Sequence, residues 1–217
     1  MAQLFQKRAN AFAKAVVIGV PVLLAATAFG IYELRESPFW TGVDRPVTQP
    51  VAFSHEHHAG ALGIDCRYCH TSVETSPFAG LPSTQTCMSC HSQIWKNAPM
   101  LQPVRESMNL GLPLRWTRVH DLPNFVYFDH SIHVKGGVAC VTCHGQVDRM
   151  PLTWKTQSLE MRWCLECHRA PEHFVRSSGE VFDARYQRDQ NAAAADDLIG
   201  RNHLQIAGLT DGYACHR

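Results

Sequence analysis

The chain has 217 residues, a length that suggests one or two small domains. Its 20 Lys and Arg against 19 Asp and Glu give a net charge of +1, so the charge balance does not indicate a nucleic-acid-binding protein. The 45% hydrophobic content argues against disorder, because it can supply a packed interior. Nine Cys and thirteen His are many for this length, and both residue types bind metals.

An apolar run near the N-terminus, residues 15–32, contains no charged residue. It is close to the roughly 20 residues that span a bilayer, and the Pro21 it contains is tolerated in membrane helices. Three basic residues precede it: Lys7, Arg8 and Lys14. By the positive-inside rule we expect residues 1–14 in the cytoplasm, a single-pass anchor at 15–34 in the inner membrane, and the remainder on the periplasmic side. A cleaved signal peptide is the alternative.

Eight of the nine Cys form Cys-x-x-Cys-His motifs, and the ninth precedes a His near the C-terminus. The Cys are Cys66, Cys69, Cys87, Cys90, Cys140, Cys143, Cys164, Cys167 and Cys215. The His that follow them are His70, His91, His144, His168 and His216.

Three chemistries compete for these cysteines. Disulfide pairing would leave one Cys over and explain none of the His. Two of the gaps between pairs fit a four-cysteine zinc site, but such a site makes no use of the following His. Cys-x-x-Cys-His is the attachment signature of c-type haem, in which the Cys form thioethers and the His is the proximal iron ligand. We therefore predict haem c.

A second pattern, Phe-x-His-x-x-His, precedes the first and third motifs. It supplies His55 and His58 in one copy and His130 and His133 in the other. Each copy is followed by two haem motifs, which indicates an internal duplication of a dihaem module. These histidines are candidates for the second, distal position on the irons. In the first copy His57, next to His58, could also be the second ligand. We favour His58, because its spacing from His55 equals that of His133 from His130.

Methionine is the alternative distal ligand, and it would raise the potential of the haem it binds. The candidates are Met88, Met100, Met108, Met150 and Met161.

The expected organisation is a dihaem module at 35–98, a Pro-rich connector at 99–124, a second module at 125–175, and a C-terminal segment at 176–217 with a fifth haem site. We expect a multihaem cytochrome c fold, mostly α and irregular with little regular secondary structure. About 40 residues per haem cannot bury a core of their own, so we expect the haems to staple the core together.

Local patterns predict a few elements of secondary structure. Each haem motif is expected on a short helix. The stretches 116–119 and 125–128 could form a hairpin, because they are β-branched and aromatic. Residues 184–199 are predicted as a helix, because they are rich in good helix formers, and Gly200 supplies a stop.

The Phe-x-His-x-x-His…Cys-x-x-Cys-His pattern resembles class III multihaem cytochromes. The resemblance implies that His55 and His130 ligate the haems attached just downstream. It also implies that His58 and His133 reach neighbouring haems, which holds the porphyrins close enough for electron hopping.

Longer stretches resemble one family more closely: the membrane-anchored pentahaem cytochrome subunit of alternative complex III. They include G-I-D-C-R-Y-C-H-T-S-V-E, R-V-H-D-L-P-N-F-V-Y-F-D-H-S-I-H-V and W-C-L-E-C-H-R-A-P-E. This resemblance implies partners in a quinol-oxidising complex: an iron–sulfur/molybdopterin-like subunit, polytopic quinol-binding subunits and a monohaem cytochrome. It also implies a soluble or oxidase acceptor for the electrons.

The sequence departs from that family at the fifth motif, where Gly212 stands in the first Cys position. We expect a fifth haem attached through a single thioether at Cys215, with His216 as its proximal ligand. His203 and His120 are the candidates for its distal ligand.

The expected function is an electron-transfer subunit without a catalytic site of its own. A single-anchor multihaem quinol dehydrogenase acting outside such a complex is the alternative. A catalytic multihaem reductase is a third class, and it would need an iron with a vacant position; the spare His make a vacant iron unexpected here.

Overall fold

The computed structural model describes residues 6–186 and 198–216, and the chain divides into two compact units, Met1–Val43 and Asp44–Arg217. In the first unit, α1 (Lys7–Glu36) is one helix of 30 residues that includes Pro21. An 18-residue stretch within Arg8–Glu36 has a mean hydropathy of 2.2 and no buried residue, so by length and composition the helix could cross a membrane. A short helix, α2 (Pro38–Thr41), follows it.

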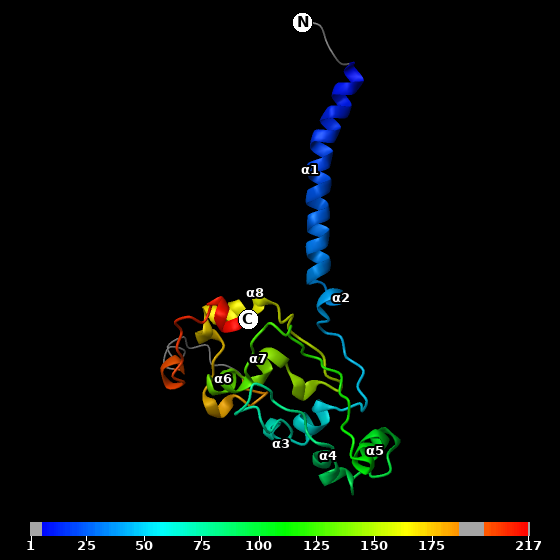
Figure 1. Cartoon of the computed structure of the whole chain (residues 1–217), viewed down its shortest axis with the longest axis vertical. Coiled ribbons are helices and arrows are strands. Elements are labelled where there is room, and N and C mark those ends of the chain that lie inside the picture. The colour runs from blue at the N-terminus through cyan, green and yellow to red at the C-terminus, as the bar shows by residue number, and fades with distance from the viewer. Residues whose placement is uncertain (1–5, 187–197, 217) are drawn as a thin grey trace. The chain divides into compact units, whose positions relative to one another are not determined.

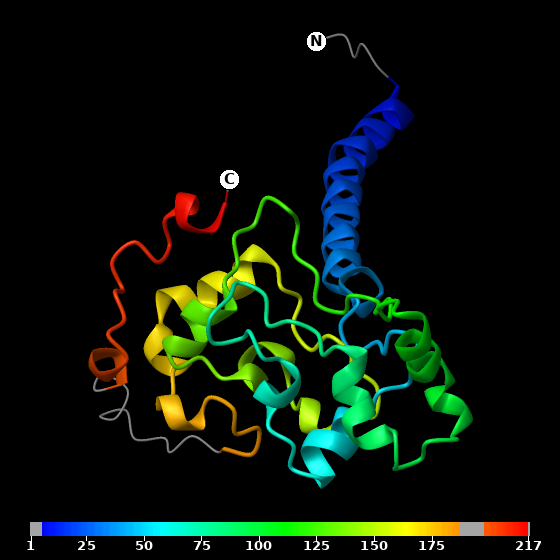
Figure 2. The same cartoon turned by 60° about the horizontal axis from the view of Figure 1, so that its bottom comes forward.

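The second unit consists of short helices joined by irregular chain, as both views show (Figure 1, Figure 2). The α-helices are α3 (Cys66–Cys69), α4 (Thr84–His91), α5 (Gln102–Leu110), α6 (His130–Lys135), α7 (Cys140–His144), α8 (Met161–Arg169) and α10 (Gly212–Cys215). The other helical turns are η1 (Glu56–Ala61), η2 (Pro99–Leu101), η3 (Val147–Arg149), η4 (Pro171–His173) and η5 (Ser178–Glu180). The described residues contain no strand, and their β-bridges, such as those between Val126 and His216 and between Val138 and Val175, are isolated. The predicted fold class, mostly α and irregular, is confirmed.

Two local predictions are wrong. The hairpin over 116–119 and 125–128 does not form, because Val126 bridges to His216 instead and the chain between the two stretches is irregular. Gly200 does not stop a helix, since residues 198–201 are helical. Of the helix predicted at 184–199, residues 184–186 are not helical and 187–197 lie outside the described residues.

The protein core of the second unit is small. Among the described residues, the buried hydrophobic side chains are Val51, Val73, Leu101, Val104, Ala139, Met150, Val175 and Val181. Three of them (Val51, Leu101 and Val104) form one cluster, where α5 packs beside α4. These side chains are too few to hold about 170 residues together by hydrophobic burial.

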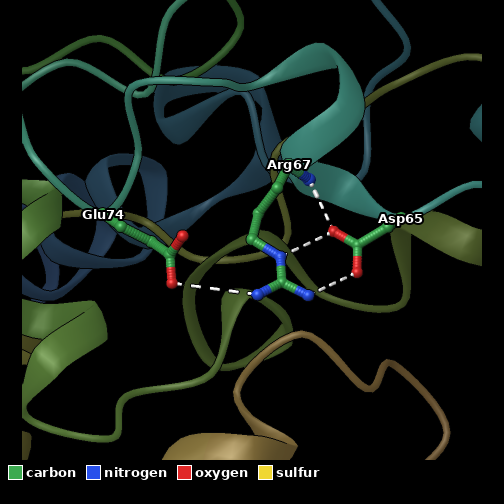
Figure 3. Close-up of polar contacts among 3 residues, drawn as sticks. All are labelled: Asp65, Arg67 and Glu74. Carbon is green, nitrogen blue, oxygen red and sulfur yellow. Dashed lines mark hydrogen bonds and ion pairs between the residues drawn. The ribbon is translucent and has the colours of Figure 1, made fainter.

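Hydrogen bonds and charge pairs hold the ends of the haem-motif helices. At α3 the side chain of Asp65 accepts a hydrogen bond from the backbone N–H of Arg67 at 2.8 Å, as an N-cap residue does. The Arg67 guanidinium forms ion pairs with the carboxylates of Asp65 and Glu74, with N···O distances of 2.8 and 3.9 Å (Figure 3). It also lies 4.4 Å from the ring centre of Phe182, which ties the first motif to the C-terminal part of the chain.

Candidate haem-binding sites

Every predicted haem motif lies on a short helix, so its Cys and His side chains come from adjoining turns. In chain order these are called site 1 (Cys66, Cys69, His70), site 2 (Cys87, Cys90, His91), site 3 (Cys140, Cys143, His144), site 4 (Cys164, Cys167, His168) and site 5 (Cys215, His216). All nine Cys are described and all are free thiols, which removes the disulfide interpretation.

Site 5 shares with site 1 a four-residue helix and the hydrogen bond that closes it. The backbone N–H of His70 donates to the carbonyl of Cys66 at 2.9 Å, and that of His216 donates to the carbonyl of Gly212 at 2.8 Å. Gly212 therefore occupies the backbone position that a first Cys takes in a complete motif, and Cys215 keeps the position of the second.

The first His of each repeated phrase lies opposite the His of the motif just downstream. The ring centres of His55 and His70 are 6.5 Å apart with an angle of 8° between the rings, and those of His130 and His144 are 6.2 Å apart at 9°. Two imidazoles on opposite sides of one metal place their ring centres about 6 Å apart, because each metal–nitrogen bond is about 2 Å and each ring centre lies about 1 Å further out. Both spacings therefore suit an iron between the rings.

The second His of each phrase lies opposite the His of the following motif. The ring centres of His58 and His91 are 6.1 Å apart, and those of His133 and His168 are 6.2 Å apart. Four of the five sites thus have a pair of imidazoles at the same spacing.

His57, the competing residue, takes a different position. Its ring stacks on Trp95 with ring centres 5.4 Å apart, and Trp95 in turn lies 6.2 Å from His91. Trp95 has a φ of +53°, a left-handed conformation that bulky residues seldom adopt. The structure therefore brings His58, and not His57, opposite the His of site 2.

In seven of the eight histidines of the four ring pairs, Nδ1 is hydrogen-bonded elsewhere, which leaves Nε2 for the iron. Six of them donate to backbone carbonyls at 2.7–3.0 Å: His58 to Ser54, His70 to Gly80, His91 to Ile94, His130 to Pro77, His133 to Asp129 and His168 to Leu209. The Nδ1 of His55 hydrogen-bonds the hydroxyl of Thr153 at 3.0 Å. A carbonyl only accepts, so each of the six Nδ1 atoms carries the proton and Nε2 has the lone pair that binds a metal.

One phenylalanine positions both histidines in each copy of the phrase. The Phe53 ring meets His55 edge-on at 4.9 Å and stacks on His58 at 4.4 Å. Phe128 meets His130 edge-on at 4.8 Å and stacks on His133 at 4.6 Å. This repeated geometry explains why the phrase begins with Phe, a role that the sequence did not reveal.

Burial keeps several of these histidines neutral. Burial, with nearby His as a smaller cause, lowers the pKa of His55 to about 4 and that of His144 to about 3. Burial also lowers the pKa of His133. Neutral imidazole is the form that binds a metal, so at neutral pH these side chains are ready to act as ligands.

The candidates for the distal ligand of site 5 are not placed opposite its His. Within the described residues, the ring of His216 pairs with Phe125 at 5.8 Å and with neither candidate. His203 is exposed, and its φ is +51°. The ring of His120 lies 4.2 Å from His144 of site 3, and its Nε2 is buried without a hydrogen-bond partner in the described part of the chain.

At sites 1 to 4 the residue opposite the motif His is a His and not one of the candidate Met residues. Met150 is buried in the protein core with 2% exposure, and its carbonyl accepts the backbone N–H of Glu56. Met88 packs against the cluster of Val51, Leu101 and Val104. The other candidates, Met100, Met108 and Met161, are exposed.

The side chains around these sites fit haem. Large apolar side chains of the second unit are exposed, among them Tyr68, Phe78, Leu81, Ile94, Trp95, Phe125, Ile132 and Tyr213. A porphyrin can cover such side chains, and it needs only two ligands from the protein. Zinc needs four, and among residues 6–186 and 198–216 no group of three or more His, Cys, Asp or Glu side chains is placed to hold a metal ion.

Comparison with known proteins agrees with this chemistry. Residues 126–197 match the family described as cytochrome c7 and related cytochrome c, and residues 41–100 match the class III cytochrome C family. The chain is also similar to the menaquinone reductase multiheme cytochrome c subunit of Nitratidesulfovibrio vulgaris strain Hildenborough, with 31% identity over 157 residues, 62% of this chain and 75% of the relative. The chain belongs to the family of multihaem c-type cytochrome subunits that includes this relative.

Proposed function

We propose that the chain is the electron-transfer subunit of a quinone-linked membrane complex and conducts electrons through five c-type haems. The observation that carries the proposal is the set of four imidazole pairs with ring centres 6.1–6.5 Å apart, each beside a Cys-x-x-Cys pair. Two His ligands on each iron of sites 1 to 4 leave no position there for a substrate, which suits electron transfer without a catalytic site at these four irons.

The proximal ligands are proposed from the His that follows each Cys motif, and the distal ligands from the ring pairs. His70, His91, His144, His168 and His216 are the proximal ligands of sites 1 to 5. The distal ligands are His55 at site 1, His58 at site 2, His130 at site 3 and His133 at site 4. Haem, when bound, supplies an iron that accepts and releases one electron. The residues of the chain hold that iron from both sides and keep its surroundings apolar.

The direction of electron flow distinguishes two forms of this function. The resemblance to the pentahaem subunit of alternative complex III favours quinol oxidation, with electrons passing to a soluble or oxidase acceptor on the periplasmic side. From the same resemblance we propose three kinds of partner: an iron–sulfur/molybdopterin-like subunit, polytopic quinol-binding subunits and a monohaem cytochrome. The relative named as a menaquinone reductase subunit favours the reverse direction as the second candidate.

Purification from native membranes tests this function. We expect the chain to co-purify with polytopic membrane subunits, and a short-chain quinol added to the complex to reduce the haems. If the haems stay oxidised with quinol but pass electrons from a reduced donor to quinone, the second candidate is correct. A chain that purifies alone and still oxidises quinol would support the single-anchor dehydrogenase instead.

The N-terminal helix α1 gives a prediction about location. We expect it to span the membrane once, because residues 15–32 are apolar and uncharged and three of the four basic residues of the helix, Lys7, Arg8 and Lys14, precede them. Protease added to the periplasmic side should therefore release the haems from the membrane, whereas protease on the cytoplasmic side should leave them attached. Full protection of the haems from the periplasmic side contradicts this orientation.

Site 5 gives a prediction about haem number. Because Gly212–Cys215 folds as a complete motif does, we expect one thioether at Cys215 and five haems per chain. A pyridine haemochrome should give five haems per chain, and mass measurement should show one haem on the C-terminal peptide. In the Cys215→Ala variant the count should fall to four. Four haems and an unmodified Cys215 in the parent protein contradict the prediction.

A further inference from the structure

The contacts between sites contain information about the order of the haems in space. The two histidines of one phrase belong to different sites but share one phenylalanine. Phe53 contacts both His55 of site 1 and His58 of site 2, at 4.9 and 4.4 Å. Because these histidines are only three residues apart, sites 1 and 2 are neighbours.

Sites 3 and 4 are linked in the same way. Phe128 contacts His130 of site 3 and His133 of site 4, at 4.8 and 4.6 Å, and both histidines lie within helix α6.

Two hydrogen bonds between the repeats, one from a His of each repeat to the other repeat, join site 1 to site 3. The Nδ1 of His130 donates to the carbonyl of Pro77, which lies between the motifs of the first repeat, at 2.7 Å. The Nδ1 of His55 hydrogen-bonds Thr153, which lies between the motifs of the second, at 3.0 Å. These two contacts make sites 1 and 3 neighbours.

The C-terminal segment joins site 4 to site 5. The Nδ1 of His168 donates to the carbonyl of Leu209 at 2.7 Å, three residues before Gly212. No comparable contact in the described residues joins site 2 to site 4 or to site 5.

We propose that the haems form one unbranched line in the order site 2, site 1, site 3, site 4, site 5, which is not their order in the sequence. The inference rests on the proposed binding of haem at these five sites. Sites 2 and 5 are then the two ends, where electrons enter and leave. Each step moves one electron, so that one site is oxidised as its neighbour is reduced. The electrons come from the quinol or donor of the proposed function and end on its acceptor.

The redox interaction between pairs of haems tests this order. An electron on one haem makes its neighbour harder to reduce, and this effect falls as the inverse of the separation. The test is a stepwise NMR redox titration of the full-length protein. In the proposed line sites 1, 3 and 4 lie one, two and three spacings from site 2, so the interaction of sites 2 and 1 should be about 2-fold that of sites 2 and 3 and about 3-fold that of sites 2 and 4. Site 3 should interact about equally with sites 1 and 4.

Ligand variants assign the resonances to sites. His58→Met should shift mainly the resonances of site 2, and His130→Met those of site 3. His173→Met is the matched control, because His173 is exposed and outside the five sites, and it should leave all haem resonances in place. If site 2 interacts more strongly with site 3 or 4 than with site 1, the proposed order is wrong.

These results are independent of quinone. The titration uses the purified chain and equilibrium potentials, so the order can hold even if no quinol reduces the haems. Conversely, quinol can reduce haems arranged in another order. If site 5 carries no haem, the interactions among sites 1 to 4 still decide the order of those four.

Discussion

The full-length chain produced without covalent haem attachment is expected not to fold beyond its N-terminal helix. Ordering the chain costs about 1–2 kcal/mol per residue in backbone entropy alone, and the few buried apolar side chains of the second unit cannot offset it. Haem changes this balance, because it covers the exposed apolar side chains and ties distant segments to one iron. In circular dichroism the haem-free chain in detergent should keep the signal of α1 and lose the near-ultraviolet signal of the second unit.

Limited proteolysis separates this prediction from a general failure of production. The haem-loaded protein, treated side by side, should resist protease over most of residues 44–217. The haem-free chain should be cut throughout that range, while α1 stays protected in the detergent micelle. A haem-free second unit that resists protease as well as the loaded protein would show that the eight buried side chains suffice.

The chemistry of the sites could be predicted from the sequence, because covalent haem attachment fixes residue types at fixed spacing. The same holds for the short helices at the motifs, since two Cys and a His must meet one porphyrin within a turn or two. The resemblance of the duplicated phrase to class III cytochromes implied which histidines pair, and the rings are placed accordingly: His55 and His130 lie opposite the next motif's His, and His58 and His133 lie opposite the one after. That these rings bind iron stays a prediction.

Contacts between distant segments could not be predicted. The carbonyls that hold the Nδ1 atoms, such as those of Pro77 and Leu209, are backbone groups, so no residue type indicates them. The hairpin failed for a related reason: Val126 has a β-branched side chain suited to a strand, but its partner is His216, some 90 residues away. Such pairings depend on how the segments assemble, and local propensity carries no information about them.

His58→Ala is expected to convert one haem to the high-spin state without detaching it. The ring of His58 lies 6.1 Å from that of His91, so its loss leaves the iron of site 2 without a sixth ligand, while thioethers at Cys87 and Cys90 keep the porphyrin attached. EPR of the oxidised protein should show one new high-spin signal and the loss of one low-spin signal. A pyridine haemochrome should show an unchanged haem count.

His57→Ala is the matched control, because it removes the same side chain from the adjacent position. The ring of His57 stacks on Trp95 at 5.4 Å and does not lie opposite a motif histidine, so all haems in this variant should stay low-spin. His133→Ala, the equivalent change in the second repeat, should give one high-spin haem at site 4, where His168 is the ring opposite. If His57→Ala produces the high-spin signal and His58→Ala does not, the distal ligand of site 2 is His57, and the two repeats bind their second haems differently.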